Sequence, residues 1–325
     1  MSYWLVRITV VITLWSSAWM MTASASPVSG GTAHLAAASN GHSLNPPAGW
    51  YPNGSATNGT DVFVAYVRRL DKQDHYESVI YRKPGLNGNF TIPACPAGGM
   101  KNVCSPVIAG KVNGMTYNPK TRQLVAAILN GSVPGSSTTT PNPDNLLFYS
   151  TQLTPSKAPN QASIPVGASA VCFDASYPQN GRYVVGGFGS GFHAYTLHST
   201  NGAISATALP NQIIQKSWLS DLRRSWTDAG TVLPQAIACN PTYVFVVVDK
   251  RAGSSFQARI YAYKWSDIER GVNAPMYYTV TKHDGSALGS MELESLFIAG
   301  NKLYATFNAN PDAYYTVSGI PLADY

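Results

Sequence analysis

The chain has 325 residues, of which 45% are hydrophobic and 12% charged, and its formal net charge is +6. The charged share is about half of the roughly 25% usual in soluble proteins, so Ser, Thr, Asn and Gln must supply much of the surface polarity. The basic residues are scattered, which argues against nucleic-acid binding. No CxxC, HExxH or paired histidine spacing occurs, so neither a metal site nor a cofactor is expected.

The N-terminus has the pattern of a secretory signal peptide. Arg7 precedes the short apolar run 8–15, and the small residues Ala23-Ser-Ala25 form a cleavage signal. The pattern predicts that residues 1–25 are removed and that the protein is extracellular, with no transmembrane segment left. An uncleaved anchor is the alternative.

Residues 26–47 are rich in Ala, Ser, Gly and Asn without periodicity. They predict a flexible leader, or else a strand that closes the fold late. The folded body is expected at 48–325, as one domain. It begins with a hairpin of Val62–Val67 and Tyr76–Tyr81 around a charged turn.

A strand-turn-strand cassette then recurs at intervals of about sixty residues, which is typical of radial repeat folds. In each copy a short apolar strand, a turn with Asn, Asp, Pro or Gly, and a second β-rich strand follow one another. The copies are 113–128, 169–187, 235–248 and 294–307. Aromatic outer strands follow them at 145–150, 192–197, 258–264 and 313–317.

With the first hairpin, the cassettes predict an all-β, five-bladed β-propeller. A six-bladed ring is the alternative, with a further blade from the leader or from residues 199–234. The cassettes also predict equivalent core residues, one in each first strand: Met115, Val171, Ile237 and Leu296.

One segment, around residues 212–228, breaks the β rhythm. Ile214, Trp218, Leu222 and Trp226 follow one another at four-residue steps, the pattern of an amphipathic helix. Such a basic, tryptophan-bearing helix either inserts into a membrane interface or docks on its own domain.

The cysteines are consistent with export. Cys95 and Cys104 flank a loop with two glycines and a proline, which predicts a local disulfide. Cys172 and Cys239 lie in successive first strands but one position out of phase, so alternation predicts opposite faces and two buried thiols. Sequons occur in turn-like stretches at Asn53, Asn58, Asn89 and Asn130.

Alignment of the cassettes places Asn113, Ser169, Gln235 and Glu294 at one equivalent position, each followed by a small residue. Innermost propeller strands crowd around the axis, so the small residues allow close approach and the polar ones can line a central channel. This predicts a ligand site. The alternative is that these groups satisfy one another or hold water.

Acids near such an axis also suggest glycoside hydrolysis, which needs two carboxyl groups, one protonated and one ionised. The candidate acids are Glu294, Glu292, Asp174, Asp249 and Glu77. Only Glu294 falls on the predicted channel position, so the sequence favours binding over hydrolysis.

The segment from Met291 to Tyr304 contains Glu-Leu-Glu-Ser-Leu before a turn and a β strand. It resembles the closing repeat of helveticin J-like proteins, and Ser169–Asp174 with Arg182–Val185 is similar to earlier repeats of that family. The resemblance covers about the C-terminal two thirds of the chain and offers no catalytic residues. It implies a large secreted bacteriocin, although the signal peptide and the disulfide depart from the pattern.

The sequence therefore predicts a secreted antibacterial protein, acting as a monomer, that binds a bacterial cell-envelope glycan or lipid surface. A secreted carbohydrate-active propeller, either lectin or glycoside hydrolase, is the alternative. A second carboxylate facing Glu294 would favour the hydrolase.

Overall fold

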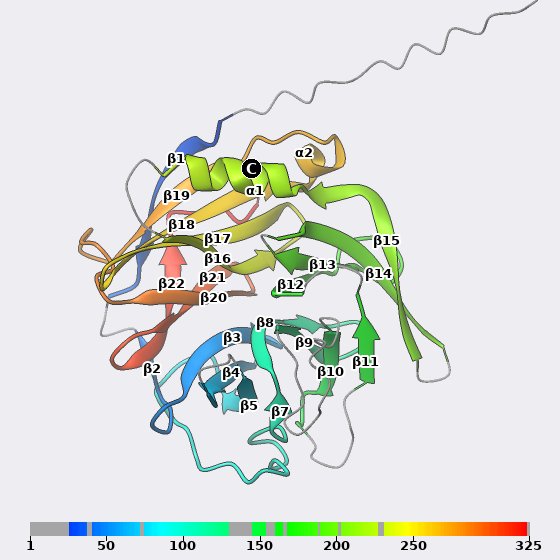
Figure 1. Cartoon of the computed structure of the whole chain (residues 1–325), viewed down its shortest axis with the longest axis vertical. Coiled ribbons are helices and arrows are strands. Elements are labelled where there is room, and N and C mark those ends of the chain that lie inside the picture. Colours follow the sequence, from blue (N-terminus) through cyan, green and yellow to red (C-terminus); the bar gives the residue numbers. More distant parts are fainter. Residues whose placement is uncertain are drawn as a thin grey trace, which may run out of the picture.

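The computed structural model describes residues 26–37, 41–71, 75–129, 145–153, 160–164, 168–187, 189–200, 203–226 and 231–323. The predicted signal peptide and the sequon at Asn130 lie outside these residues. The described part is an all-β, propeller-like body with two short helices (Figure 1). No helix in this part is long and apolar enough to cross a membrane.

The strands form successive antiparallel meanders, because each cassette supplies short β-rich segments separated by turn residues. The first meander is β3 (Tyr51–Thr57), β4 (Asp61–Arg69), β5 (Tyr76–Pro84) and β7 (Ile108–Ala109). The second is β8 (Lys111–Asn118), β9 (Gln123–Leu129), β10 (Asn145–Ser150) and β11 (Asn160–Ser163). The third is β12 (Ala170–Asp174), β13 (Arg182–Gly187), β14 (Gly191–Thr200) and β15 (Ala203–Ile214).

The fourth meander is β16 (Thr231–Cys239), β17 (Tyr243–Ala252), β18 (Ser255–Lys264) and β19 (Met276–Thr281). The last one is β20 (Glu292–Ala299), β21 (Lys302–Asn308), β22 (Asp312–Ser318) and the early strand β2 (His42–Asn45), which also pairs with β6 (Phe90–Thr91).

The described residues of the N-terminal segment, 26–37 and 41–47, are not a flexible leader. β1 (Val28–Leu35) pairs in parallel with β19 and antiparallel with β22, while β2 supplies a strand to the last meander. The segment lacks periodicity because few of its side chains, Ala33, Leu35 and Leu44, are buried hydrophobics and backbone pairing holds the rest. The prediction of a closing strand is therefore the correct one.

The first strands of the meanders form a closed circle. β3 contacts β8, β8 contacts β12, β12 contacts β16, β16 contacts β20, and β20 contacts β3 again. Figure 1 shows these strands toward the centre and the later strands toward the rim. A hydrophobic cluster fills the space between each pair of successive meanders. Another cluster packs Phe297 and Tyr304 of the last meander against Val64 and Tyr66 of the first.

The predicted core residues are confirmed. Met115, Val171, Ile237 and Leu296 lie on β8, β12, β16 and β20, and each is at least 97% buried. Each packs in the cluster shared with the preceding meander. The repeat therefore places equivalent side chains in equivalent packing environments.

The small residues after the channel position allow the first strands to approach one another closely. A Cβ on Gly114 would lie 2.8 Å from the Cα of Ala170 and 3.0 Å from the backbone nitrogen of Val171. Both contacts are with the backbone of β12, which cannot swing away as a side chain can. A glycine is required here because of the contact between strands.

We expect Gly114→Ala to lower the free energy of unfolding by about 1–3 kcal/mol, the usual cost of overpacking. Gly98→Ala is the matched control, since a Cβ at Gly98 meets nothing within 4 Å. Chemical denaturation of both variants measures the difference. Equal stability of the two variants would contradict the close approach of β8 and β12.

The helical insertion is shorter than predicted. α1 spans Lys216–Arg224, whereas Ile214 ends β15 and reaches the same core from a strand. Trp218 is 3% exposed and stacks on Tyr263 with 6.1 Å between ring centroids, and Leu222 is 0% exposed. Of the two alternatives for this helix, docking on its own domain is therefore the one that the structure shows.

Trp226, the last residue of the predicted stripe, is half-buried beyond the end of α1. Its ring lies 4.1 Å from the guanidinium carbon of Arg259, a cation–π contact within the domain. A second helix, α2 (Trp265–Glu269), buries Trp265 and Ile268. No helical period is recognisable in this stretch of sequence, because the helix is only 5 residues long.

The structure contains two disulfides. Cys95–Cys104 is present as predicted, with 6.3 Å between Cα atoms. Cys172 and Cys239 also form a disulfide, so the prediction of two buried thiols is wrong. The alternation argument failed because successive meanders stack face to face. Opposite faces of neighbouring sheets are the ones that meet, and both cysteines belong to the cluster between the third and fourth meanders.

Candidate functional site

The predicted channel residues share a backbone feature that the sequence did not reveal. β3, β8, β16 and β20 each shift register near their start, at Asn53, Asn113, Gln235 and Glu294. Ser169 stands just before β12, where its N–H donates to the carbonyl of Gly186. A β-bulge redirects its side chain and frees the local backbone. The repeated bulge gathers one polar residue from each first strand at the same end of the circle.

Several of these side chains are joined by hydrogen bonds. Asn53 Nδ2 donates to Asn113 Oδ1 at 3.1 Å, and Asn113 Nδ2 donates to the carbonyl of Ser169 at 2.7 Å. Gln235 Nε2 donates to Glu292 Oε1 at 3.0 Å. The structure therefore brings these predicted residues together. Part of their hydrogen-bonding capacity is satisfied within the group, as the alternative prediction expected.

Asn53 belongs to this group and was missed as a site residue. The signal was available, because Asn53-Gly54 repeats the polar-small pair of the other first strands. Its side chain is 1% exposed, so this sequon is closed to glycosylation in the folded protein. Asn89 is exposed.

Glu294 is the acid of the group. Its side chain is buried, and burial, reinforced by the charge of Glu292, raises its pKa to about 8. Lys111 and a hydrogen bond with the side chain of Asn308 act in the opposite direction. Glu294 is therefore protonated at neutral pH and available as a proton donor.

Two further carboxyl groups lie near Glu294. Glu292 is half-buried; burial raises its pKa, while Lys111 and Arg251 lower it. Asp249 on β17 is 2% exposed and accepts the Leu293 N–H on Oδ2 at 3.0 Å. Its Oδ1 has no hydrogen-bond partner in the described part of the chain, and burial raises its pKa. Glu292, the least buried of the three, is the one best placed to ionise.

The raised pKa of Glu294 predicts a pH-dependent stability. The unfolded chain ionises this group above its ordinary pKa of 4.5, whereas the folded chain keeps the proton up to about 8. The wild type therefore loses stability as pH rises through this window. We expect Glu294→Gln to gain melting temperature relative to wild type between pH 5 and pH 8, by at least about 2–4 °C. A constant difference across this range would contradict the neutral carboxyl.

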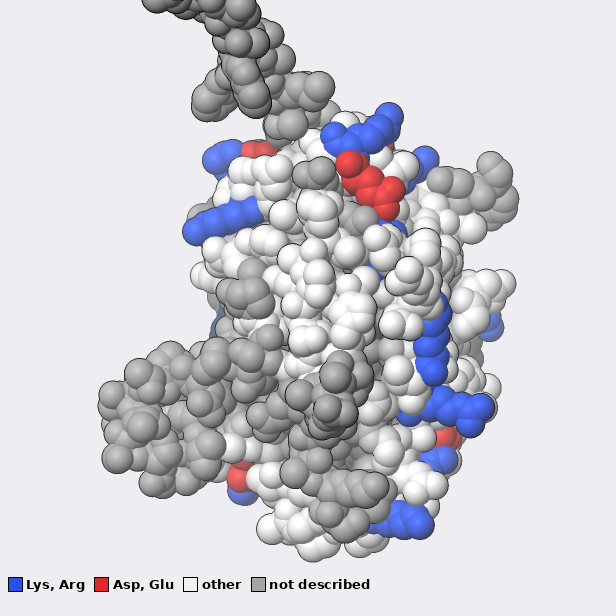
Figure 2. All heavy atoms as spheres, turned by 90° about the vertical axis from the view of Figure 1, so that its right-hand side faces the viewer, with Lys and Arg blue, Asp and Glu red and all other residues white. Residues whose placement is uncertain are grey.

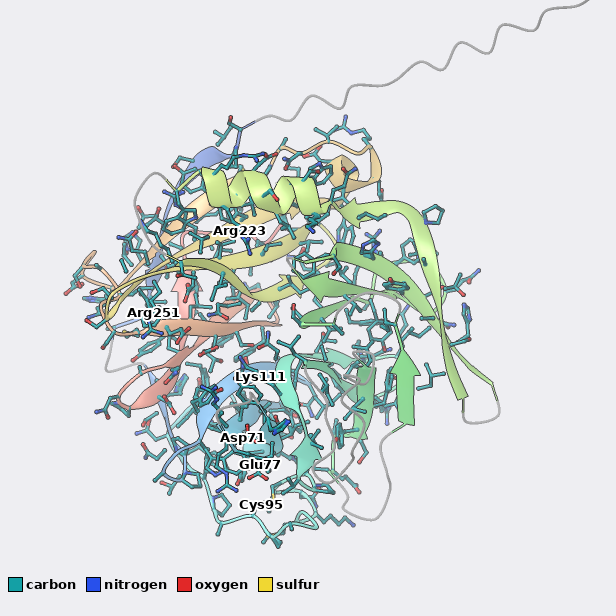
Figure 3. The ribbon with its side chains drawn as sticks, in the orientation of Figure 1. Asp71, Glu77, Cys95, Lys111, Arg223 and Arg251 are labelled. Carbon is teal, nitrogen blue, oxygen red and sulfur yellow. A yellow bond between two sulfur atoms is a disulfide. The ribbon has the colours of Figure 1, made fainter. Side chains whose placement is uncertain are left out.

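Basic and phenolic groups surround the acids. Lys111 opens β8, and its Nζ lies 5.9 Å from the centre of the Tyr76 ring. Arg251 lies near the end of β17, in the hairpin with β18 (Figure 3). Burial raises the pKa of the Tyr51 hydroxyl. The charges of Glu294 and Glu292 raise this pKa further, and the charge of Arg69 lowers it. These residues come from the first and second meanders on one side and the fourth and last on the other.

The other candidate acids are not part of this group. Asp174 ends β12, at the opposite end of that strand from Ser169, and its Oδ2 accepts the Arg182 Nε at 3.0 Å. Glu77 pairs with Arg68 on the neighbouring strand. Both are structural ion pairs.

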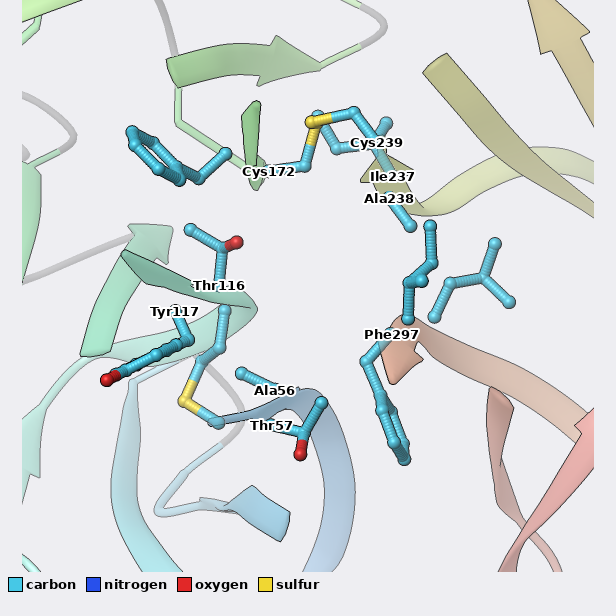
Figure 4. Close-up of a pocket in the computed structure, with 13 residues that line it drawn as sticks. Ala56, Thr57, Thr116, Tyr117, Cys172, Ile237, Ala238, Cys239 and Phe297 are labelled. Atoms are coloured by element: carbon cyan, nitrogen blue, oxygen red, sulfur yellow. A yellow bond between two sulfur atoms is a disulfide. The ribbon is translucent and has the colours of Figure 1, made fainter. Parts of the chain in front are cut away.

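The opposite end of the first strands is mainly apolar. A cavity of about 90 Å³ lies there, lined by residues that include Tyr117, Phe173, Leu296 and the Cys172–Cys239 disulfide (Figure 4). The two ends of the circle thus differ in chemistry, and two buried carboxyl groups, Glu294 and Asp249, lie toward the end with the bulges.

The end of the circle with the bulges, called the polar end below, has the components of acid-base chemistry. It offers a neutral carboxyl, a second carboxyl that ionises more easily, and amide side chains able to hold hydroxyl groups. The second carboxyl does not face Glu294 across the axis, as hydrolysis was expected to require, but lies two residues away on the same strand. Among the described residues, no group of three or more His, Cys, Asp or Glu could hold a metal ion.

A scan against protein-family models finds no match, and a search of curated proteins finds none. Among solved structures, the chain is similar to a protein described with the GH130 family, in which glycoside hydrolases target β-1,2 mannosidic linkages in Candida mannan. The identity is 9% over 97% of this chain and 98% of that chain, with a TM-score of 0.42.

A glycosyl hydrolase from Bacteroides ovatus is similar at 6% identity over 84% of this chain and 85% of that chain, with a TM-score of 0.41. The WD40 repeats of RRP9 are similar at 9% identity over 90% and 100%, with a TM-score of 0.36. At TM-scores below 0.5 these likenesses carry no argument about activity.

Proposed function

We propose that this chain is a secreted, carbohydrate-active, five-bladed β-propeller that cleaves a glycan at the polar end of its first strands. The blade count is supported by the closed circle of β3, β8, β12, β16 and β20. The N-terminal strands join existing sheets and so leave no material for a sixth blade there. Two disulfides support secretion.

The observation that carries the proposed activity is the pair Glu294 and Glu292. Two carboxyl groups with different burial lie close enough for one charge to raise the pKa of the other. Cleavage of a glycosidic bond needs such a division, with one group donating a proton to the leaving oxygen and the other acting as base or nucleophile. The neighbouring amides of Asn53, Asn113 and Gln235 are suited to hold sugar hydroxyls.

The experiment is to incubate the purified mature chain with a panel of neutral and acidic polysaccharides and to measure new reducing ends. We expect release from at least one of them. Binding to a glycan without turnover would indicate a lectin, the second of the two carbohydrate-active functions that the sequence allows. Neither binding nor turnover across the panel would contradict the proposed function.

The relation to helveticin J-like proteins stays a prediction. The docked helix gives the protein no membrane-inserting element at α1, since Trp218 and Leu222 are buried. If the resemblance holds, the glycan would belong to a bacterial cell envelope, and the antibacterial effect would follow from action on that glycan.

A further inference from the structure

We propose that Asp249 is a positioning residue for the acid pair: by accepting the Leu293 N–H, it fixes the backbone bulge that carries Glu294. This inference rests on the proposed function and adds a residue of the neighbouring meander to the same site. It follows from one hydrogen bond, from the place of Asp249 on its strand, and from the way the bulge is held on both sides.

Asp249 is an acid at a position where the strand otherwise packs apolar side chains. Tyr243, Phe245 and Val247 alternate along β17 on the face that packs against the last meander. The next position in this row is Asp249, which is 2% exposed. Acids are scarce in this chain, which has 16 Asp and Glu residues and shows few of them on the face in Figure 2. Because burial of a carboxyl group costs free energy unless its polar atoms are bonded, this position needs an explanation.

The hydrogen bond that Asp249 makes provides one. Among the described strands, β20 pairs only with β21, so the backbone N–H groups on its inner side need partners from outside the sheet. Asp249 Oδ2 accepts one of them, the Leu293 N–H, at 3.0 Å. Leu293 stands between Glu292 and Glu294 in the chain. The bond therefore holds the piece of backbone that joins the two acids.

The bulge is held from two neighbouring meanders. The register of β20 with β21 shifts between Leu293 and Ser295, so Glu294 is the extra residue. On one side, Ser295 Oγ accepts the N–H and the hydroxyl of Ser55 in the first meander, each at 2.8 Å. On the other side, Asp249 of the fourth meander holds Leu293. Loss of Asp249 removes one of these two anchors and frees the extra residue to relax.

The second oxygen of Asp249 indicates more than a structural role. Oδ1 is buried and has no hydrogen-bond partner in the described part of the chain. A side chain selected for stability alone would have both oxygens bonded, because an unbonded buried polar atom costs free energy. Unfavourable local arrangements of this kind are typical of functional sites.

The protonation of Glu294 depends on where the bulge holds it. Burial is the largest cause of its raised pKa. A bulge that relaxes toward water would therefore lower this pKa toward its ordinary value of 4.5. The titratable groups around Glu294 come from several strands: Tyr51 on β3, Lys111 on β8, Asp249 on β17, Glu292 on β20 and Asp312 on β22.

The test compares Asp249→Asn, which keeps an oxygen for the Leu293 N–H, with Asp249→Val, which suits a strand but has no acceptor. We expect Asp249→Val to lower kcat for glycan cleavage by about 10–100-fold with little change in KM, as for a misplaced catalytic group. The alkaline limit of its pH profile should move to lower pH, because Glu294 then loses its proton earlier. Asp249→Asn should stay close to wild type in both respects.

Thr57→Val is the matched control. Thr57 Oγ1 accepts the Gly59 N–H at 3.0 Å and is buried at the far end of β3 from the bulge. Valine there also removes one buried acceptor of a backbone N–H, but away from the acids. This variant should keep the kcat and the pH profile of wild type whatever its melting temperature. If Asp249→Val does not fold, Asp249→Ser takes its place, because its oxygen lies one bond closer to the strand.

A second measurement needs no turnover. The gain in melting temperature that Glu294→Gln shows as pH rises is measured in three backgrounds: wild type, Asp249→Asn and Asp249→Val. We expect the gain to persist in Asp249→Asn. It should shrink in Asp249→Val, because a relaxed bulge lets water reach Glu294 and lowers its pKa.

Equal gains in all three backgrounds, or an unchanged kcat and pH profile in folded Asp249→Val, overturn this inference. An Asp249→Asn variant as impaired as Asp249→Val also overturns it, since the carboxyl group itself would then be required. If the wild type cleaves no glycan, the proposed function fails. The melting temperatures still decide, in that case, whether Asp249 holds the bulge at Glu294.

Discussion

Glu294→Gln is expected to lower kcat for glycan cleavage by about 10²–10⁴-fold, the usual contribution of a general acid. Glutamine keeps the size of the side chain and can still bond to Asn308, but it has no proton to give to the leaving oxygen. Because Glu294 is buried between strands, the substitution removes chemistry without opening a cavity. The measurement is the initial rate of reducing-end release under saturating glycan.

The pH profile gives an independent check of the roles. Activity requires Glu294 protonated and Glu292 ionised, so the rate should fall as pH rises through about 8, where Glu294 loses its proton. It should also fall at low pH, where Glu292 gains one. Glu292→Gln should lower turnover by orders of magnitude, and the activity that remains should no longer fall at low pH.

The matched control is Glu269→Gln, the same substitution at a carboxylate that pairs with Arg182 outside the site. It should keep full activity. If Glu294→Gln retains wild-type kcat, the acid assignment is wrong.

The fold could be predicted where the repeat was regular. Met115, Val171, Ile237 and Leu296 were identified because the polar-small-apolar order recurs in each first strand. The fourth strands β11, β15 and β19 were missed, since strands at the rim show weaker alternation. β1 and β2 were expected only as the alternative to a flexible leader, because they are held by pairing with strands more than 200 residues away, which no local pattern records.

The site could be predicted in part. The ladder of Asn113, Ser169, Gln235 and Glu294 follows from the cassette alignment, but Asp249 and Lys111 do not, because they reach the site from a second strand and from the start of a first strand. Glu292 was a candidate acid, but the cassette alignment did not assign it to the channel position. Only the bulge, which breaks strict alternation at Glu294, brings both acids of one strand into the same polar group.

Removal of the Cys172–Cys239 disulfide, by Cys172→Ala with Cys239→Ala, is expected to cost about 4 kcal/mol of unfolding free energy. The bond closes a loop of 67 residues and joins β12 to β16, the first strands of two different meanders. Cross-linking restricts the unfolded chain, and the effect grows with the logarithm of loop length. Alanine avoids placing two hydroxyl groups in the apolar cluster between these meanders.

The matched comparison is Cys95→Ala with Cys104→Ala, which opens a loop with a sequence separation of only 9. Its expected cost is below about 3 kcal/mol, because a short loop restricts the unfolded chain less. Guanidinium denaturation of both variants and the wild type gives the two free energies. The larger loss should come from Cys172–Cys239, whose removal also frees the third and fourth meanders to separate at the ring's apolar end. A smaller loss than for Cys95–Cys104 would show that packing alone, through Trp218, Ile237 and their neighbours, holds these two meanders together.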